Sequence, residues 1–249
     1  MRLITQGKSF ACNGSTLSSV FVKEGLYYLK NITNKNEKMK VYSLRHRVFC
    51  QELGWVPQTN NLLEVDDYDE KAVFFGVFDE YHKIKAFLRV VMPPSTFMLE
   101  KEFPYLLSQH NKIRKENDTI EISRLCVAPE ARNEKLAGNF GVHSVSMMLY
   151  KGVYHWCLKN KIRYLYLVVE EKIYRLLCAR GFPCKLIGEA KVMPDGVIAV
   201  AAMLDWREFE ETSKIKRSKM FAWFSQNQLN QSLTQLPQRG ACLPHQVFS

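Results

Sequence analysis

The chain has 249 residues, of which 47% are hydrophobic and 12% aromatic, enough apolar material for one sizeable core. Its 35 Lys and Arg against 25 Asp and Glu give a formal net charge of +10, which favours a polyanion or an acidic protein as partner. No run approaches the roughly 20 apolar residues of a membrane-spanning helix. No DNA-binding or RNA-binding motif accompanies the basic residues, so we expect no nucleic-acid partner.

The seven cysteines form no Cys-x-x-Cys pair and lie mostly in apolar runs such as "RLCV" and "RLLCARGF". Free thiols in such runs behave as small hydrophobes, and an odd number argues against a disulfide framework. The N-terminus shows no apolar segment of the kind found in signal peptides. We therefore expect a cytoplasmic protein with reduced cysteines and no metal site.

The first half of the chain alternates loops, one helix and a hairpin. Residues 1–17 contain Ser, Gly and Asn and are expected to form a flexible arm. Residues 19–31 have a β-branched and aromatic bias that predicts a first strand or a short helix. Residues 36–55 place apolar side chains near helical spacing and end close to Gly54, which predicts a helix. Two strand-like runs joined by the polar turn "EYHK" predict a hairpin over 71–94.

A strand, a helix and another strand are expected next. Within residues 118–132, apolar and polar side chains alternate before Pro129 ends the strand. Residues 139–159 predict the longest helix of the chain, which is amphipathic. Residues 163–171 form a continuous apolar run that predicts a strand buried on both faces.

The last elements of the predicted sheet follow a second helix. Residues 171–182 predict that helix, closed by Gly181 at its C-terminal cap. Residues 183–190 and 196–205 predict a strand pair around the turn "MPDG". The order of elements indicates a mixed sheet flanked by helices.

The chain is expected to form one main domain, residues 18–207, followed by a tail. From about residue 208 it loses strand patterning and becomes basic, then rich in Gln and Asn. This composition predicts a loosely attached tail over 208–249. Its segment "KIKRSKMFAWF" combines basic and aromatic residues and is a candidate for peripheral contact with an anionic membrane, a disordered tail being the alternative.

Charged and polar residues border the predicted strands at four places, where each charge must be paired or used. They are Arg45 with Arg47, the acids Glu64, Asp66, Asp67 and Asp69, the single Arg89, and Glu121 with Ser123 and Arg124. In one sheet these groups converge at one end. They suit a zwitterionic substrate, whose amine needs acceptors and whose carboxylate needs a guanidinium fork. The alternative is a buried ion-pair network that orients the strands.

Ten residues in this order and spacing resemble the signature of the acyl-homoserine-lactone (autoinducer) synthase superfamily and its relatives, the long-chain N-acyl amino acid synthases. They are Arg45, Phe49, Trp55, Glu64, Asp66, Asp69, Arg89, Glu121, Ser123 and Arg124. The match spans residues 41–130, and the element order extends it to about 205. The resemblance implies an α/β, GNAT-like acyltransferase fold with a mixed, mostly antiparallel central sheet. It also implies transfer of a long fatty acyl group from acyl carrier protein to an amine.

The donor is expected to be the acyl-phosphopantetheine of an acidic acyl carrier protein, with no tightly bound cofactor. GNAT enzymes that use coenzyme A hold its pyrophosphate in a glycine-rich loop at a helix N-terminus. Here Arg132 is followed by "NEKLA", so neither expected glycine is present. A carrier-borne phosphopantetheine has no pyrophosphate and does not need this loop.

The resemblance implies catalytic roles for Glu121, Ser123 and Arg124. Glu121 is the candidate base that removes a proton from the ammonium group, and its alternative role is to pair with Arg89 or Arg124. Backbone amides along a bulged strand over 122–127 are expected to bind the thioester oxygen, with Ser123 nearby.

The resemblance also implies binding roles. The acceptor would contact Arg45, Trp55, Asp66, Asp69 and Arg89, with the two aspartates receiving its amine. The alternative for these acids is to cap the start of a strand. Glu64 is expected in an ion pair and Phe49 in the core, and the acyl chain is expected to be lined by Leu125, Met148 and Leu167.

The acceptor is left open by the sequence. A free amino acid such as tyrosine is favoured over S-adenosylmethionine, because Leu125 follows Arg124 where homoserine-lactone synthases commonly carry an aromatic residue. A non-catalytic GNAT-like binding module is a further alternative. The complete set of motif residues argues against that module.

Overall fold

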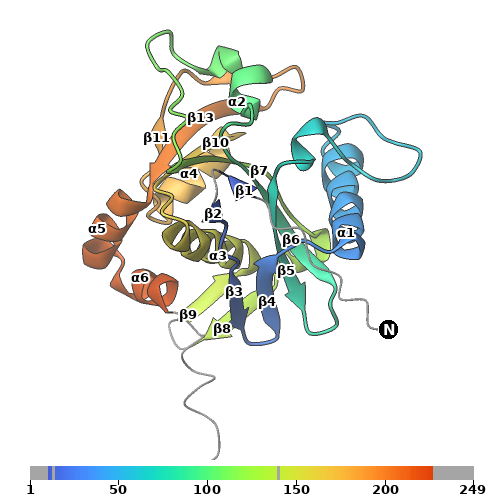
Figure 1. The fold of residues 1–249 in the computed structure, drawn as a ribbon, viewed down its shortest axis with the longest axis vertical. Helices are drawn as coiled ribbons and strands as arrows, with labels where there is room; N and C mark the ends of the chain where they lie inside the picture. Colours follow the sequence, from blue (N-terminus) through green and yellow to red (C-terminus); the bar gives the residue numbers. More distant parts are fainter. Residues whose placement is uncertain (1–10, 13–14, 139–140, 227–249) are drawn as a thin grey trace, which may run out of the picture.

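The computed structural model of the protein describes residues 11–12, 15–138 and 141–226 (Figure 1). Most of the expected N-terminal arm and all of the chain beyond 226 lie outside these residues. The described part of the arm forms a short antiparallel pair of β1 (Ala11–Cys12) and β2 (Ser15–Thr16). Among the described residues, no helix is long and apolar enough to cross a bilayer.

A nine-stranded sheet forms the centre of the molecule, in the order β11-β13-β10-β7-β6-β5-β4-β3, with β12 also paired to β13. Only β7 and β10 are parallel neighbours, so the expected mixed, mostly antiparallel sheet is confirmed. The strands are β3 (Phe21–Glu24), β4 (Tyr27–Asn31), β5 (Val73–Asp79), β6 (Ile84–Val91), β7 (Thr119–Val127), β10 (Tyr164–Glu170), β11 (Lys185–Leu186), β12 (Lys191–Val192) and β13 (Ile198–Asp205).

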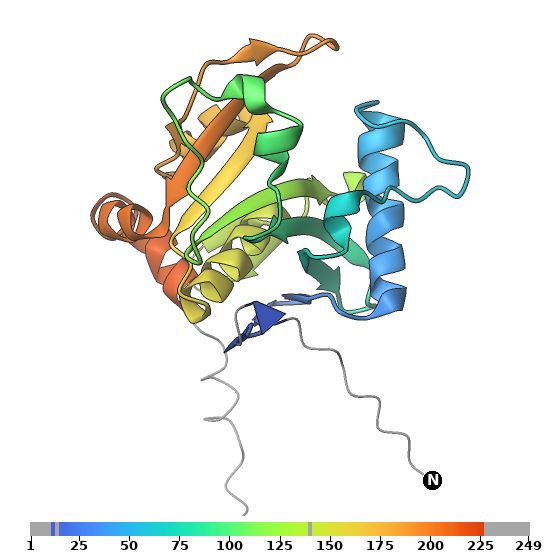
Figure 2. The same ribbon diagram turned by 45° about the horizontal axis from the view of Figure 1, so that its top comes forward.

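Helices cover both faces of this sheet, as expected for central strands that are largely apolar. The helices are α1 (Lys35–Arg45), α2 (Met98–Lys101), α3 (Val145–Lys159), α4 (Glu171–Ala179), α5 (Trp206–Lys216) and α6 (Ser218–Ser225). Figure 2 shows α1 and α3 on opposite sides of the sheet. Every residue of β6 is buried. Its side chains alternate between faces, so Arg89 points toward the α1 face and Leu88 toward α3.

The helix predicted over 36–55 is present and has two parts. The Asn34 side chain caps α1 by accepting the backbone N–H of Asn36 at 2.7 Å. The helix then continues as a π-helical segment, His46–Glu52, and the chain leaves it at Gly54, whose φ is 66°. The hairpin of β5 and β6, the strand β7 and the helix α4 are likewise found where the sequence predicted them.

A close approach of α3 to the sheet depends on one glycine. A Cβ placed on Gly152 would lie 2.3 Å from Leu29 Cδ2 on β4. Only a residue without a side chain leaves room for fully buried Leu29. This contact fixes the height of α3 above β4 and, with it, the depth of the space between α3 and β6.

Two local predictions are corrected by the structure. Residues 19–31 form neither a single strand nor a helix but the hairpin β3–β4, which turns at Gly25 with φ of 56°. The long helix begins at Val145 rather than 139, because the preceding residues pair as β8 (Lys135–Gly138) with β9 (Gly141–Ser144). Ser144 then caps α3 with its side chain.

The prediction of a loosely attached tail is wrong for residues 208–225. These residues form α5 and α6, whose Phe209, Trp223 and Phe224 are at most 1% exposed. Their rings pack on Tyr154 of α3 and on one another, so the hydrophobic effect holds both helices to the domain. The aromatic residues Trp223 and Phe224 are therefore not available to a membrane surface. The Gln-rich and Asn-rich remainder, residues 227–249, lies outside the described part of the chain.

Candidate active site

Strand β7 carries a β-bulge where it passes β6. Ser123 lies opposite Arg89 and Cys126 lies opposite Phe87, so two residues of β7 face the single Leu88. One of the two, Arg124, has φ of 52°, a left-handed conformation that costs a non-glycine residue of order 1–3 kcal/mol. Such bulges re-aim side chains next to active sites.

Strands β7 and β10 separate beside this bulge. Their parallel pairing ends at the rung of Ile122 and Leu167, although β7 continues to Val127 and β10 to Glu170. Beyond that rung, no strand among the described residues pairs with the edge of β7 that faces β10. Its backbone N–H groups are available to a polar ligand.

Three arginines and three carboxylates meet on the α1 face of the sheet next to the bulge. The ion pairs are Arg45 with Glu64 and Asp69, Arg89 with Asp66 and Asp69, and Arg124 with Glu64 and Asp66. Asp69 Oδ1 lies 2.7 Å from Arg45 Nη1 and 2.8 Å from Arg89 Nη1. The structure thus brings together six of the sequence-predicted residues in one network whose formal charges cancel.

Burial separates the members of this network into two groups. The side chains of Arg45, Glu64 and Asp69 are at most 4% exposed, whereas those of Asp66 and Arg124 are 20% and 16% exposed. This difference favours a scaffold role for the first group. Asp66 and Arg124 are the members that an acceptor can reach directly, whereas Arg89 is fully buried and its Nη2 is covered by Met98.

The acids also shape the loop before β5. Asp66 caps the 3-10 turn Asp67–Asp69 by accepting the Tyr68 backbone N–H at 3.0 Å, and Asp69 accepts the Asp66 backbone N–H at 2.9 Å. Asp67 itself is exposed. Arg47 lies outside the network and pairs with Glu130 at 2.5 Å.

The ion pairs set the protonation of the buried acids. Burial alone would raise the pKa of Glu64, but the adjacent Arg45 guanidinium outweighs it and holds that pKa below its usual range. Burial acts on Asp69 in the same direction, and Arg45 with Arg89 again lowers the pKa. Both carboxylates are therefore charged at neutral pH and neutralise the buried guanidiniums.

Glu121 lies on the same face of β7 but pairs with backbone rather than with an arginine. Its two oxygens accept the N–H groups of Met98 at 2.6 Å and Leu99 at 2.8 Å, at the start of α2. The side chain is 1% exposed. This burial raises its pKa to about 7 even though the two amides act against the shift. A carboxylate in this state is suited to exchange protons near neutral pH.

The Met98 thioether sits between two guanidiniums. Its sulfur lies 3.1 Å from Arg89 Nη2 and 3.8 Å from Arg124 Nη1. Thioether sulfur is a weak hydrogen-bond acceptor, so both charged donors have only a poor partner there. Ser123 Oγ is already engaged, because it accepts the Arg89 Nε–H at 3.0 Å. The position between the two guanidiniums is thus well suited to a carboxylate.

Trp55 and Phe49 form an aromatic wall next to Arg124. Phe49 is buried, with its ring 5.6 Å from the Arg124 guanidinium and stacked 6.2 Å from the Trp55 ring. Trp55 is 43% exposed. It therefore presents a flat apolar surface to whatever binds at Arg124.

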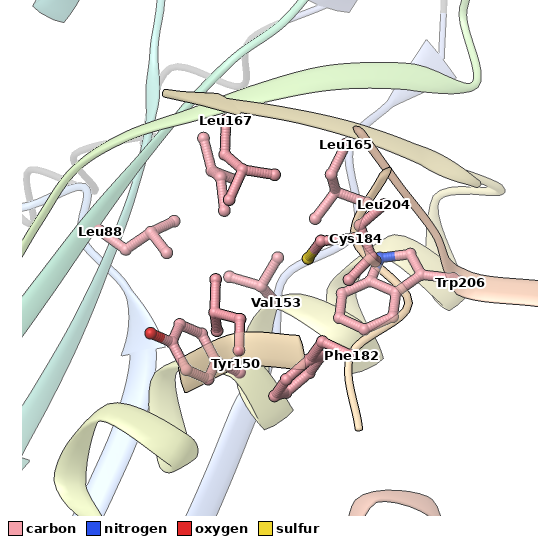
Figure 3. Close-up of a pocket in the computed structure, with 11 residues that line it drawn as sticks. Leu88, Tyr150, Val153, Leu165, Leu167, Phe182, Cys184, Leu204 and Trp206 are labelled. Atoms are coloured by element: carbon pink, nitrogen blue, oxygen red, sulfur yellow. The ribbon is translucent and has the colours of Figure 1, made fainter. Parts of the chain in front are cut away.

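An apolar cavity of about 40 Å³ lies on the opposite face of the sheet, between the sheet and α3. Leu167 lines it, together with Leu88 opposite the bulge, as Figure 3 shows. Met148 and Leu125, the other two residues expected to line the acyl chain, are not on its wall. Met148 is fully buried within the core, and Leu125 is a half-buried residue packed against it.

The stretch that follows β7 differs from a pyrophosphate loop. It consists of a short 3-10 turn, Pro129–Ala131, and then the β8–β9 hairpin. The first turn of α3 is already capped, since Met147 donates its backbone N–H to Ser144 Oγ at 3.4 Å. Among the described residues, no cluster of three His, Cys, Asp or Glu side chains is placed to hold a metal ion.

A mixed sheet whose parallel pair opens beside a bulged strand has the arrangement of a GNAT-like fold, and the buried carboxylate of raised pKa marks its candidate active site. The profile of the autoinducer synthase family matches residues 29–214. The chain therefore belongs to the autoinducer synthase family.

Individual relatives agree with this assignment. The acyl-homoserine-lactone synthase of Vibrio anguillarum is 27% identical over 155 residues, which are 62% of this chain and 78% of that protein. The coenzyme A-dependent acyl-homoserine lactone synthase BjaI, solved with SAM and isopentyl-CoA, has a TM-score of 0.61 at 19% identity, covering 76% and 81% of the two chains. FeeM, an N-acyl amino acid synthase from uncultured soil microbes, has a TM-score of 0.54 at 14% identity, covering 80% and 96%. At such identities the two structures establish the fold alone.

Two features of the site were missed by the sequence analysis. The role of Met98 depends on α2, a helix of four residues that is too short for a periodic pattern. Trp206 lines the cavity from a segment next to the expected tail. The signal there was the helical spacing of the apolar residues Trp206 and Phe209, which lie on the buried face of α5.

Proposed function

We propose that the protein makes an acyl-homoserine lactone by transferring an acyl group from a thioester to the amine of S-adenosylmethionine. The opening between β7 and β10 beside Glu121 is the observation that carries the transfer. The choice of acceptor rests on the relatives, which are acyl-homoserine-lactone synthases. In this proposal the network of charges on the α1 face becomes an acceptor site, and the cavity on the α3 face becomes an acyl site.

The thioester enters along the free edge of β7. Amide N–H groups of the bulged strand beyond Ile122 hydrogen-bond the thioester oxygen and stabilise the charge that develops on it. The acyl chain passes to the α3 face near Leu88 and Ile122, both of which line the cavity. The pantetheine arm extends away between the two strands.

Glu121 acts as the base in the first step. It takes a proton from the acceptor ammonium, directly or through a water, and the amine nitrogen attacks the thioester carbon. The C–N bond forms and the C–S bond breaks. Of the two protons that nitrogen loses, one reaches solvent through Glu121 and the other ends on the departing thiol.

The second step closes the lactone. A carboxylate oxygen of the acylated acceptor attacks the carbon that bears the sulfonium, the C–S bond breaks, and methylthioadenosine leaves with the electron pair. The guanidiniums of Arg89 and Arg124 are proposed to hold this carboxylate once Met98 moves aside. Asp66 is the nearest carboxylate with an exposed edge and is proposed to face the cationic end of the acceptor, while Trp55 offers its ring to the adenine.

Acyl carrier protein is the proposed donor. The β8–β9 hairpin stands where a pyrophosphate loop would lie, and the chain has a net charge of +10, which attracts an acidic carrier. Coenzyme A is the alternative donor, since BjaI is described as coenzyme A-dependent.

A free amino acid is the second candidate acceptor. It is favoured by Leu125, which stands where an aromatic residue is common in homoserine-lactone synthases, and by the fold shared with FeeM. A free amino acid carries the same ammonium and carboxylate, so it would use Glu121, Arg89 and Arg124 in the same way. It would yield an N-acyl amino acid and no lactone.

The test is mass spectrometry of the products formed by the purified protein. Acyl carrier protein and coenzyme A, each carrying the same octanoyl group, are supplied with S-adenosylmethionine or with the twenty amino acids. The proposal expects octanoyl-homoserine lactone from the first acceptor. If only N-octanoyl amino acids form, a free amino acid is the acceptor. If neither acceptor gives a product, a non-catalytic binding module is the better account.

A further inference from the structure

The cavity on the α3 face has two distinct ends. Figure 3 shows Leu88 and Leu167 on one side, and Phe182 and Trp206 on the other. Leu167 belongs to the last rung before β7 and β10 separate, so this side opens toward the proposed thioester site. Phe182 and Trp206 form the far end, which we call the aromatic floor.

The aromatic floor is supported from behind by the C-terminal helices. Phe209 of α5 stacks on Phe182 at 5.3 Å and contacts Trp206 at 5.4 Å. Phe224 of α6 packs on Phe182 at 5.9 Å. Both supporting rings are fully buried. The floor therefore cannot yield outward without disturbing close-packed rings.

The helix α6 lies beyond the segment that the family profile matches. The profile match ends at residue 214, whereas α6 spans Ser218–Ser225.

We propose that the aromatic floor of Phe182 and Trp206, held in place by α5 and α6, limits the acyl group to short chains. This inference rests on the proposed acyl transfer. A cavity of about 40 Å³ is well below the roughly 150 Å³ that accommodates benzene in an engineered cavity. It is a smaller space than the long-chain donor implied by the resemblance would need.

The depth of the cavity sets an upper limit on the length of the chain. Leu167 and Leu165 both line it, and two residues of strand span about 6.6 Å. An extended chain advances roughly 1.2 Å per bond, since a three-bond residue spans at most about 3.6 Å. A chain whose carbonyl lies at the bulge therefore reaches the floor after about six to eight carbons.

The experiment measures kcat/KM for butanoyl, hexanoyl, octanoyl, dodecanoyl and hexadecanoyl carrier protein with S-adenosylmethionine. The wild-type protein is expected to use hexanoyl or octanoyl donors at least tenfold better than hexadecanoyl. Trp206→Leu opens the floor and is expected to shift the ratio of dodecanoyl to hexanoyl by at least tenfold. Equal use of all chains by the wild type, or an unchanged ratio in the variant, would overturn the proposal.

Trp156→Leu is the matched control. Trp156 is also a buried indole, 1% exposed, but it packs on Phe75 and does not line the cavity. It is expected to lower the rate with all donors by one factor. Should Trp206→Leu not fold, Val153→Ile narrows the cavity with a single methylene and is expected to move the preference toward butanoyl.

A binding measurement separates this inference from the proposed function. Alkanoyl-pantetheine amides do not react, and calorimetry gives their Kd whether or not the protein catalyses transfer. Kd is expected to fall about fourfold per added methylene up to the floor and then to stop falling, with the plateau displaced to longer chains in Trp206→Leu. A plateau in Kd without any catalytic product would support the chain-length limit set by the aromatic floor and contradict the proposed function. A Kd that falls continuously up to the hexadecanoyl compound would contradict that chain-length limit.

Discussion

Glu121 on β7 accepts the backbone N–H of Leu99 at 2.8 Å, which ties the candidate base to the first turn of α2. The same carboxylate accepts the Met98 N–H, and Met98 in turn contacts both Arg89 and Arg124. The candidate base and the candidate carboxylate site are thus connected through one short helix. A substitution of Glu121 is therefore expected to affect the candidate carboxylate site as well as the candidate base.

The first prediction concerns pH. Burial raises the pKa of Glu121 to about 7, and a base must be deprotonated to act. We therefore expect kcat/KM to fall tenfold per pH unit below about pH 7 and to level off above it. Glu121→Gln is expected to lower kcat by about 10²–10⁴ and to abolish this pH dependence, as steady-state rates between pH 5.5 and 8.5 would show. A variant that keeps the wild-type profile would identify another group as the base.

The same raised pKa affects stability with a defined sign. Between the ordinary value of 4.5 and about 7, the folded state keeps a proton that the unfolded chain has released. Stability from this group is therefore greatest below pH 4.5 and is lost as pH rises to about 7, by at most about 3 kcal/mol. Urea unfolding of the wild type and of Glu121→Gln at pH 5 and 8 isolates it, because other groups titrate in both proteins. The unfolding free energy of the wild type, relative to that of Glu121→Gln, is expected to be lower at pH 8 than at pH 5. A relative value that does not fall would contradict the buried state of Glu121.

A second prediction concerns the buried network. Asp69→Asn removes the charge that lies between Arg45 and Arg89, and an uncompensated buried guanidinium costs about 3–5 kcal/mol. Urea denaturation is expected to show a loss of that size. The exposed pair of Glu52 with Arg132 provides the control, since Glu52→Gln is expected to cost less than about 1 kcal/mol. Equal losses would mean that the network does not hold the site together.

Arg124 provides a third prediction. Its guanidinium reaches Glu64 Oε1 at 3.1 Å and Asp66 Oδ2 at 2.9 Å, and a lysine ammonium cannot reproduce this fork. Arg124→Lys is expected to raise KM for the acceptor about 10–100-fold, the value of one charged hydrogen bond, with KM for the acyl donor little changed. Arg132→Lys, at an exposed pair, is the control. Initial rates measured at varied concentrations of acceptor and of donor give the two KM values. A rise confined to the KM of the donor would show that Arg124 does not bind the acceptor.

The fourth prediction tests whether α6 belongs to the folded domain. Trp223 is 1% exposed, its ring lies 4.6 Å from Lys151 Nζ, and it packs on Phe224. Trp223→Ala is expected to cost about 3–5 kcal/mol of unfolding free energy. Ile215→Ala, at a side chain that is 85% exposed, is expected to change it by less than about 0.5 kcal/mol. Thermal and urea unfolding measure the unfolding free energy of both variants. If that of Trp223→Ala equals the wild-type value, α6 is a loosely attached tail.

The sequence predicted those parts of the site that follow a local pattern. The alternation of Ile120 and Ile122 with Glu121 and Ser123 indicated one polar face of β7, and that face is the one that meets Arg89. The acids before β5 were expected to converge with arginines from other elements, and the ion pairs show the convergence. Period-2 burial is a short-range property, which explains why it can be seen in the sequence.

Long-range partners could not be predicted in this way. Glu121 was expected to neighbour an arginine or an amine, but it binds amides of a helix that begins 23 residues earlier in the chain. Nothing in the letters "STFML" specifies that docking. The buried α6 was hidden by the basic residues around it, although Met220, Trp223 and Phe224 have helical spacing. Its stability comes from tertiary packing rather than from its own sequence.

Stoichiometry of the released products tests the central claim most directly. Free thiol from the octanoyl donor and methylthioadenosine from S-adenosylmethionine are quantified in one reaction, with Glu121→Gln alongside. Acyl transfer followed by lactone closure predicts one methylthioadenosine per thiol, and a large loss of both in the variant. Thiol released without methylthioadenosine would contradict the synthesis of a homoserine lactone.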